Sequence, residues 1–103
     1  MPNRVEFAED LLHGVARLRA RWETNGNEVT TFTVQLEAWH DGEWLGIRRY
    51  DDAHGRPHVD ILDRQRNEYH KVWLNCTRSD ALTLALRDIH GNWERFLAEY
   101  TEG

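Results

Sequence analysis

The sequence predicts a small α+β domain, with a C-terminal helix packed on one face of a five-stranded antiparallel sheet. Three observations carry this prediction. Between residues 15 and 74, short stretches alternate apolar and polar residues, as strands do. Asn25-Gly26 and Asp41-Gly42 separate such stretches and are strong hairpin-turn signals. Residues 79–100 place apolar side chains at helical spacing instead. A chain of 103 residues fits one domain, spanning residues 1–103.

The first segment predicts a short N-terminal helix at about residues 4–13. Asn3 followed by Glu6 resembles a capping box, and Gly14 would end the helix. Three apolar residues then share one helical face: Val5, Ala8 and Leu12.

The next two strands form a hairpin with one apolar face. The first runs from Val15 to Trp22 and alternates apolar residues with Arg17, Arg19 and Arg21. The second puts four apolar residues on one face: Phe32, Val34, Leu36 and Ala38. A three-residue loop ending at Asn27 matches the two apolar faces and pairs Ala20 with Phe32, because a one-residue slip would reverse every side chain.

A two-residue loop at Asp41-Gly42 pairs Ala38 with Leu45, Leu36 with Ile47 and Trp39 with Trp44. The third strand then runs to about Asp51. Gly55 and Pro57 make residues 52–57 a loop. A fourth strand at 58–63 points Val59 and Ile61 inward, where they meet Leu74 and Val72 of the fifth strand.

The last helix is the clearest element. Ser79 is a good N-cap and Asp80 suits the helix dipole. The apolar stripe of this helix needs an apolar partner, which the inner face of the sheet supplies. The stripe is formed by Leu82, Ala85, Leu86, Ile89, Trp93, Phe96, Leu97 and Tyr100.

Composition indicates a cytoplasmic protein that does not span a membrane. No apolar run approaches the ~20 residues of a membrane span, the N-terminus lacks a signal-peptide core, and Cys76 is the single cysteine and is expected in the core. The net charge of −5 argues against generic DNA binding. Residues 48–71 nevertheless hold six Lys or Arg and three His, so a local anion site and an ordinary solvated surface both fit.

Strand alternation predicts a polar cluster on the open face of the sheet. Arg49 and Asp51 have inward parity and are expected as a structural ion pair. The candidate catalytic residues are His54, His58, Arg48, Tyr50, Asp60 and Lys71. Two histidines can exchange protons with a phosphate ester, Arg and Lys can stabilise its charge, and Trp73 or Tyr50 can stack a base. These residue types therefore suit metal-independent RNA cleavage, with no cofactor.

Two other interpretations compete with catalysis. A metal could bind among Asp51, Asp52, His54, His58 and Asp60, although Gly55 and Pro57 exclude a helical zinc motif. The open face could instead be a non-enzymatic interaction module. It would use Trp39, Trp44, Trp73 and Tyr50 together with the stripe of Arg17, Arg19 and Arg21. Three tryptophans are too apolar to remain exposed to water on one small domain, and the sequence therefore predicts a homodimer or cover by the N-terminal helix.

The segment RRYDDAHGRPHVD resembles small uncharacterised bacterial domains with the pattern Arg-Tyr-Asp-x-x-His-Gly-x-x-His. The matching positions here are 49–51, 54–55 and 58, followed by Lys71-Val72-Trp73-Leu74 and residues 88–93. Some of these domains are similar to TumE-type toxins of toxin–antitoxin pairs. The resemblance implies a bacterial toxin with an antitoxin partner and RNA as its target.

Overall fold

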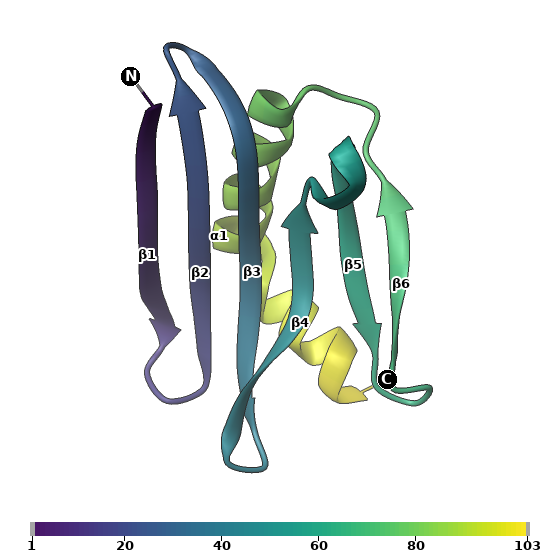
Figure 1. The fold of residues 1–103 in the computed structure, drawn as a ribbon. Helices are drawn as coiled ribbons and strands as arrows, with labels where there is room; N and C mark the ends of the chain where they lie inside the picture. Colours follow the sequence, from purple (N-terminus) through teal and green to yellow (C-terminus); the bar gives the residue numbers. More distant parts are fainter. Residues whose placement is uncertain (1, 103) are drawn as a thin grey trace.

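The computed structural model describes residues 2–102, which form one six-stranded antiparallel sheet and one long helix (Figure 1). The strands lie in sequence order, β1-β2-β3-β4-β5-β6. Their bounds are β1 Pro2–Leu12, β2 Ala16–Asn25, β3 Glu28–His40, β4 Glu43–Asp51, β5 His58–Asp63 and β6 Glu68–Trp73. A short 3-10 turn, η1 (Ala53–Gly55), joins β4 to β5, and α1 (Arg78–Glu102) follows β6.

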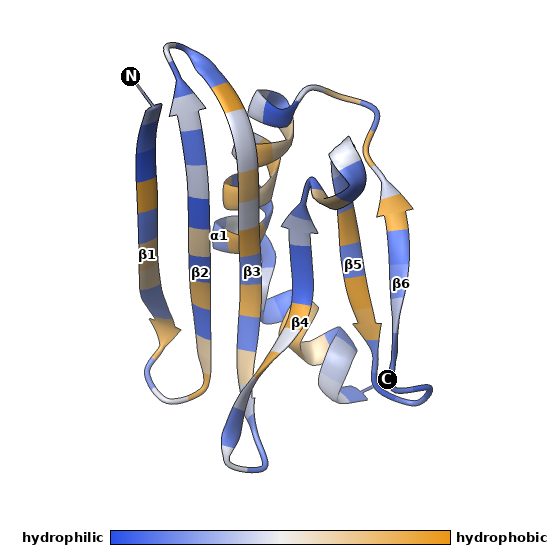
Figure 2. Cartoon of the chain, viewed as in Figure 1, coloured by the Kyte–Doolittle hydropathy of each residue, from blue (hydrophilic) through white to orange (hydrophobic). Residues whose placement is uncertain are grey.

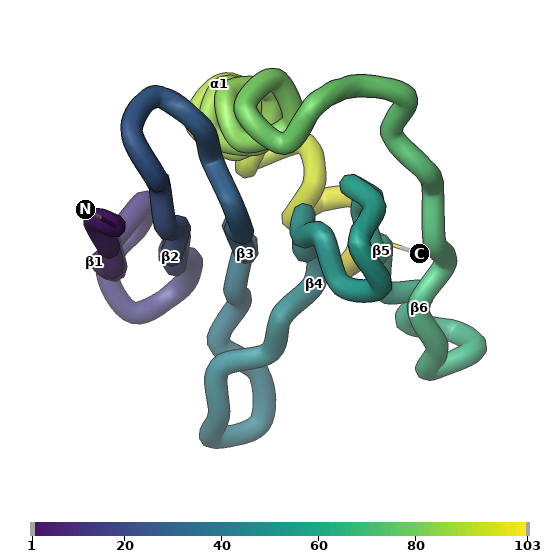
Figure 3. The backbone as a smooth tube through the Cα atoms, turned by 45° about the horizontal axis from the view of Figure 1, so that its top comes forward, coloured from purple at the N-terminus to yellow at the C-terminus, as the bar shows by residue number. Residues whose placement is uncertain are grey.

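The predicted α+β class and the C-terminal helix are confirmed. Helix α1 lies against one side of the sheet and crosses mainly β3 (Figure 3). Orange apolar bands on β2, β3 and α1 in Figure 2 mark where the two layers meet. Fully buried side chains at this contact include Leu18, Phe32, Val34, Leu36, Ala85 and Ile89. We call this side of the sheet the helix face and the other side the open face.

The predicted N-terminal helix is wrong, because residues 2–12 form strand β1 and add a sixth strand to the sheet. Val5 and Phe7 alternate with polar residues and lie opposite Trp22 and Ala20 of β2. The segment thus fits the two-residue alternation of a strand as well as the spacing of a helix. Pairing satisfies the backbone groups along the edge of β2, which a separate helix would leave open.

The first hairpin keeps its predicted faces in a different register. Ala20 lies opposite Val34, not Phe32, and Asn25 lies opposite Glu28. The turn is therefore two residues long, and an irregularity beyond Glu23 restores the match of apolar faces. The β5–β6 hairpin also keeps its faces, but Val59 lies opposite Val72 and Ile61 opposite His70, not opposite Leu74 and Val72 as predicted.

A β-bulge in β4 reverses part of the predicted face assignment. Ala38 pairs with Leu45 and Trp39 with Trp44 as predicted, but Leu36 lies opposite Arg48 instead of Ile47. Ile47 is the extra residue, and such an insertion reverses the alternation that follows it. Beyond the bulge, Arg48 and Tyr50 turn to the helix face, while Arg49 and Asp51 turn to the open face. The expected inward position of Arg49 and Asp51 is therefore wrong.

Two smaller points concern the expected environment of the chain. Within residues 2–102, no helix is long and apolar enough to cross a membrane. Cys76 is exposed in the loop before α1, contrary to the predicted core position. Partial desolvation and the nearby Asp80 raise the pKa of its thiol, so the thiol is not activated as a nucleophile.

Candidate functional site

Three ionisable side chains meet on the open face where β4 and β5 pair. Asp51 lies opposite His58 in the register, and Asp60 follows two residues later on the same face. His58 Nε2 lies 2.7 Å from Asp51 Oδ1 and 3.4 Å from Asp60 Oδ2. All three residues are buried. The prediction that His58 and Asp60 share the open face agrees with this arrangement.

Further contacts hold the His58 ring in place. Its Nδ1 lies 3.0 Å from the carbonyl oxygen of Arg56, and the Trp73 ring packs edge-on against the imidazole at 5.4 Å. The Nδ1 contact is a hydrogen bond, and Nε2 faces the two carboxylates. The side chain is 1% exposed. Its geometry suits a buried structural partner of two carboxylates better than a proton-transfer group that must touch a substrate.

Two cations complete this network from the solvent side. Arg49 lies 3.3 Å from Asp51 and 3.6 Å from Asp60. Lys71 Nζ lies 3.6 Å from Asp60 Oδ1. Arg49 Nε is buried without a hydrogen bond, since its short contact with Asp51 has poor angular geometry. Both side chains remain more than one-third exposed, so their charged ends reach solvent above the carboxylates.

The same cluster is the only metal candidate among the described residues 2–102. One ligand atom from each of Asp51, His58 and Asp60 lies within 4.8 Å of the others. A bond from His58 Nδ1 to a backbone carbonyl is also common at metal ligands. However, Arg49 and Lys71 already neutralise the two carboxylates, and a divalent ion would have to displace both. We therefore interpret the cluster as a closed ion-pair network.

Arg48 and Tyr50 belong to the opposite side of the sheet, so the predicted six-residue catalytic set is divided. Arg48 Nε donates to Tyr50 Oη at 2.9 Å, and the Tyr50 hydroxyl donates to Asp88 Oδ2 of α1 at 2.9 Å. The Arg48 guanidinium stacks 3.9 Å from the Phe96 ring. Burial has the largest effect and raises the pKa of Tyr50. Arg48 lowers this pKa, and the hydrogen bond and charge of Asp88 raise it, so that the pKa of Tyr50 is raised to about 12. Tyr50 is therefore a neutral link between sheet and helix.

His54 stays apart from this cluster. It lies in η1, exposed, with a left-handed backbone φ of 67°. That conformation is uncommon outside glycine, although histidine is enriched among the exceptions. The metal alternative that included Asp52 and His54 is not supported by the geometry, because Asp52 accepts from Arg78 Nε at 2.8 Å and from Thr31 at 3.0 Å.

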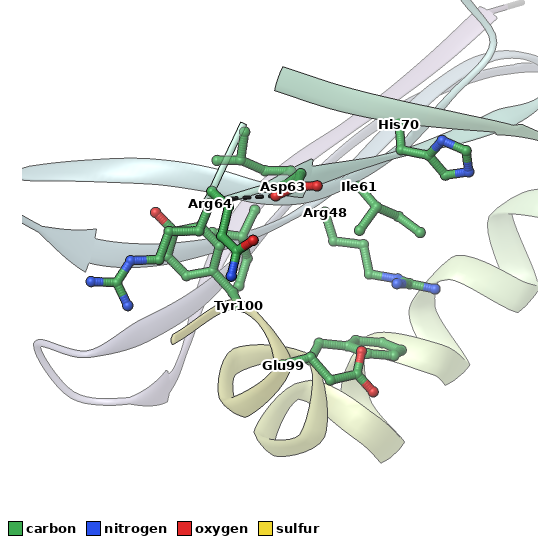
Figure 4. Close-up of a pocket in the computed structure, with 11 residues that line it drawn as sticks. Arg48, Ile61, Asp63, Arg64, His70, Glu99 and Tyr100 are labelled. Carbon is green, nitrogen blue, oxygen red and sulfur yellow. Dashed lines mark hydrogen bonds between the residues drawn. The ribbon is translucent and has the colours of Figure 1, made fainter. Parts of the chain in front are cut away.

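A hollow lies on the helix face, between β4–β5 and the end of α1 (Figure 4). Its volume is about 420 Å³. Arg48 and His70 point toward this space, and Glu99 and Tyr100 border it from the helix. Sequence reasoning missed His70 here, although the position opposite Ile61 indicates this face.

The exposed part of the open face carries basic and aromatic side chains that the sequence only partly indicated. Tyr69, Lys71 and Trp73 occupy alternate positions of β6, and Arg49 and Arg56 lie beside them. Arg56 lies 4.9 Å and Lys71 5.4 Å from the Trp73 ring centre, and Arg49 lies 5.7 Å from that of Tyr69. The two rings are 47% and 46% exposed. We call these five residues the basic-aromatic surface. The alternation of residues 69, 71 and 73 was the available signal for Tyr69.

Comparison with known proteins gives one match. The model of a family described as a domain of unknown function, DUF7718, matches residues 1–103. No curated protein and no solved structure matches the chain.

The buried Tyr50 link predicts a distinct ionisation. In an alkaline titration followed at 295 nm, one of the three tyrosines should ionise with a pKa near 12. Below pH 10 both folded and unfolded chains keep this proton, so it adds no pH dependence. Between pH 10 and 12 the unfolded chain releases the proton first, and stability is lost. Tyr50→Phe should abolish the late transition; if the transition persists, the assignment is wrong.

The ion-pair network predicts a large stability effect at Asp60. Asp60→Ala removes the carboxylate shared by His58, Arg49 and Lys71, and leaves Asp51 as the one carboxylate in contact with His58 and Arg49. The free energy of unfolding in urea should fall by about 3–5 kcal/mol. Glu68→Ala, an exposed carboxylate at the end of the same hairpin, is the matched control and should change it by less than about 0.5 kcal/mol. Equal effects would show that the network does not stabilise the fold.

Proposed function

We propose that this chain, which belongs to the DUF7718 family, binds single-stranded RNA on its basic-aromatic surface. The observation that carries the proposal is the order aromatic–cation–aromatic along one face of β6, at Tyr69, Lys71 and Trp73. This is a modified form of the interaction-module interpretation, with RNA as the partner. It does not require His58 to reach a substrate.

Stacking is the first physical argument. Side chains four residues apart on a strand are separated by about 13 Å, so Tyr69 and Trp73 can each stack a different base of one extended strand. Proteins that bind single-stranded RNA commonly stack unpaired bases on aromatic rings and on guanidinium planes. Arg56, already over the Trp73 ring at 4.9 Å, extends that stacking platform.

Charge is the second argument. Arg49, Arg56 and Lys71 hold their charged groups above the sheet, whereas Asp51 and Asp60 are buried beneath them. A phosphate approaching the face meets the cations first. The overall charge of −5 opposes long-range attraction of a polyanion. Binding should therefore depend on local stacking and be weak at high salt.

Fluorescence anisotropy with a labelled twelve-nucleotide RNA of mixed sequence tests the proposal. Trp73→Ala should raise the Kd by roughly 5- to 150-fold, because stacking of one base contributes about 1–3 kcal/mol. Tyr69→Ala should also raise the Kd, and it leaves the Trp73 ring in place against His58.

Trp39→Ala is the matched control, since Trp39 is also half-exposed but lies at the far end of β3. Its Kd should equal that of the wild type. No binding by the wild-type chain, or the same loss with Trp39→Ala as with Trp73→Ala, would exclude this surface. Each variant is first checked for an unchanged unfolding transition, because Trp73 packs against His58.

A second candidate function is the toxin-type RNA cleavage implied by the resemblance, with an antitoxin as partner. His54 alone favours it, because an exposed imidazole in a left-handed turn is available for proton transfer. Residues in such sparsely populated conformations cluster at functional sites. His54 would then act without His58.

Induced expression in a bacterial host, together with cleavage of the same RNA, tests this candidate. His54→Asn keeps a residue that tolerates the left-handed conformation but removes the imidazole. It should abolish growth arrest and lower cleavage by about 10²–10⁴-fold. His13→Asn, at another exposed histidine, is the control and should change neither the growth arrest nor the cleavage rate. Equal growth with wild type and empty vector would exclude toxicity.

A further inference from the structure

Strand β1 forms a long outer edge of the sheet that has no partner within residues 2–102. Nearly all its residues are exposed, including Val5 and Phe7 at 38% and 37%. The opposite edge, β6, is only six residues long. A long exposed strand edge offers unpaired N–H and C=O groups that readily pair with another chain.

The side chains of β1 are divided between the two faces. Val5, Phe7 and Glu9 lie opposite Trp22, Ala20 and Leu18 of β2, on the helix face. Within residues 4–10, the residues of β1 on the open face are Arg4, Glu6, Ala8 and Asp10. Phe7 is therefore the centre of a seven-residue segment, with a cation at one end of the open face and an anion at the other.

We propose that β1 pairs antiparallel with β1 of a second copy of this chain, around a two-fold axis through Phe7. The axis must pass midway between one residue and its own counterpart, because only then do paired side chains lie on the same face of the joined sheet. The axis at Phe7 pairs Phe7 with its own counterpart and Arg4 with Asp10 of the second copy, twice by symmetry. The result is one continuous twelve-stranded sheet.

The charged side chains favour this register over the registers in which the axis lies at a neighbouring residue. An axis at Glu6 would place Glu6 opposite its own counterpart, and an axis at Ala8 would place Glu6 opposite Asp10. Like charges directly opposite each other destabilise a strand pair. An axis at Val5 would pair Arg4 with Glu6, but it would leave residues 9–12 without partners.

The groups needed for this pairing are free to take part. Arg4 and Asp10 now contact only near neighbours, Glu6 at 2.8 Å and His13 at 3.4 Å, and their side chains are 57% and 59% exposed. Val5 would face Glu9, whose carboxylate is drawn aside by His90 of α1 at 3.1 Å. A pairing of β1 with β6 of another copy would be a head-to-tail contact, which does not close and would produce growing chains.

Charge reversal tests the interface. Light scattering after size-exclusion chromatography should give the wild type twice the protomer mass of 12.2 kDa. Arg4→Asp and Asp10→Arg should each raise the dimer Kd on the order of tenfold, because each removes two attractive pairs and creates two repulsive ones. The double variant should restore the wild-type Kd. A wild-type monomer at 100 µM, larger species that grow with concentration, or no restoration would overturn the proposal.

Disulfide trapping tests the register of the proposed β1–β1 pair directly. In a Cys76→Ser background, Phe7→Cys should form an intermolecular disulfide, since residues directly opposite have Cβ atoms about 4.5–5.5 Å apart and a disulfide needs only a small approach from there. Val5→Cys, the control, should not cross-link, because its counterpart lies about four residues along the strand. Cross-linking of Val5→Cys without Phe7→Cys would overturn the proposed register. If Phe7→Cys does not fold, the charge-reversal measurement decides.

Discussion

The β-bulge at Ile47 is the constraint on which both faces of the sheet depend, because one extra residue reverses the alternation of everything that follows in β4. Gly46 lies beside it, facing Gln35, and a Cβ at this position would lie 2.8 Å from Gln35 Cδ. The bulge sends Arg48 and Tyr50 to the helix face. Without it, these two residues would lie on the open face and Arg49 and Asp51 would lie under α1.

This reversal separates two kinds of polar contact. On the helix face, buried Tyr50 needs one acceptor and one donor, and Asp88 and Arg48 supply them. On the open face, His58, Arg49 and Lys71 surround the carboxylates of Asp51 and Asp60. Buried polar groups are thus paired on both sides, apart from Arg49 Nε, which has no hydrogen bond. The network also holds the strands that carry Arg49, Lys71 and Trp73, which leaves these side chains at the surface available for a ligand.

Much of this architecture could be predicted from the sequence, because side-chain periodicity reports faces more reliably than register. The apolar faces of β2, β3, β5 and α1 followed from alternation, and a slip of two residues in the first hairpin left them unchanged. The bulge gave no comparable signal. Arg48 and Arg49 are chemically alike, so exchanging their faces left the pattern plausible. Residues 4–12 fit both helical and strand periods, and only the open edge of β2 decided between them. His58 could be placed on its face, but its burial under Trp73 depends on tertiary packing.

Because of the bulge, Arg49 lies on the open face, next to the side chains of β6 that we propose bind RNA. Proton–nitrogen correlation spectra of the chain, with and without single-stranded RNA, test this proposal most directly, because each of the five tryptophans contributes one indole N–H signal. The signals of the Trp73 indole and of the backbone amides of Arg49 and Lys71 should shift in proportion to added RNA, while the signals of Trp39 and Trp93 stay fixed. Shifts centred on Trp39, or on the helix-face hollow around His70, would contradict the proposal.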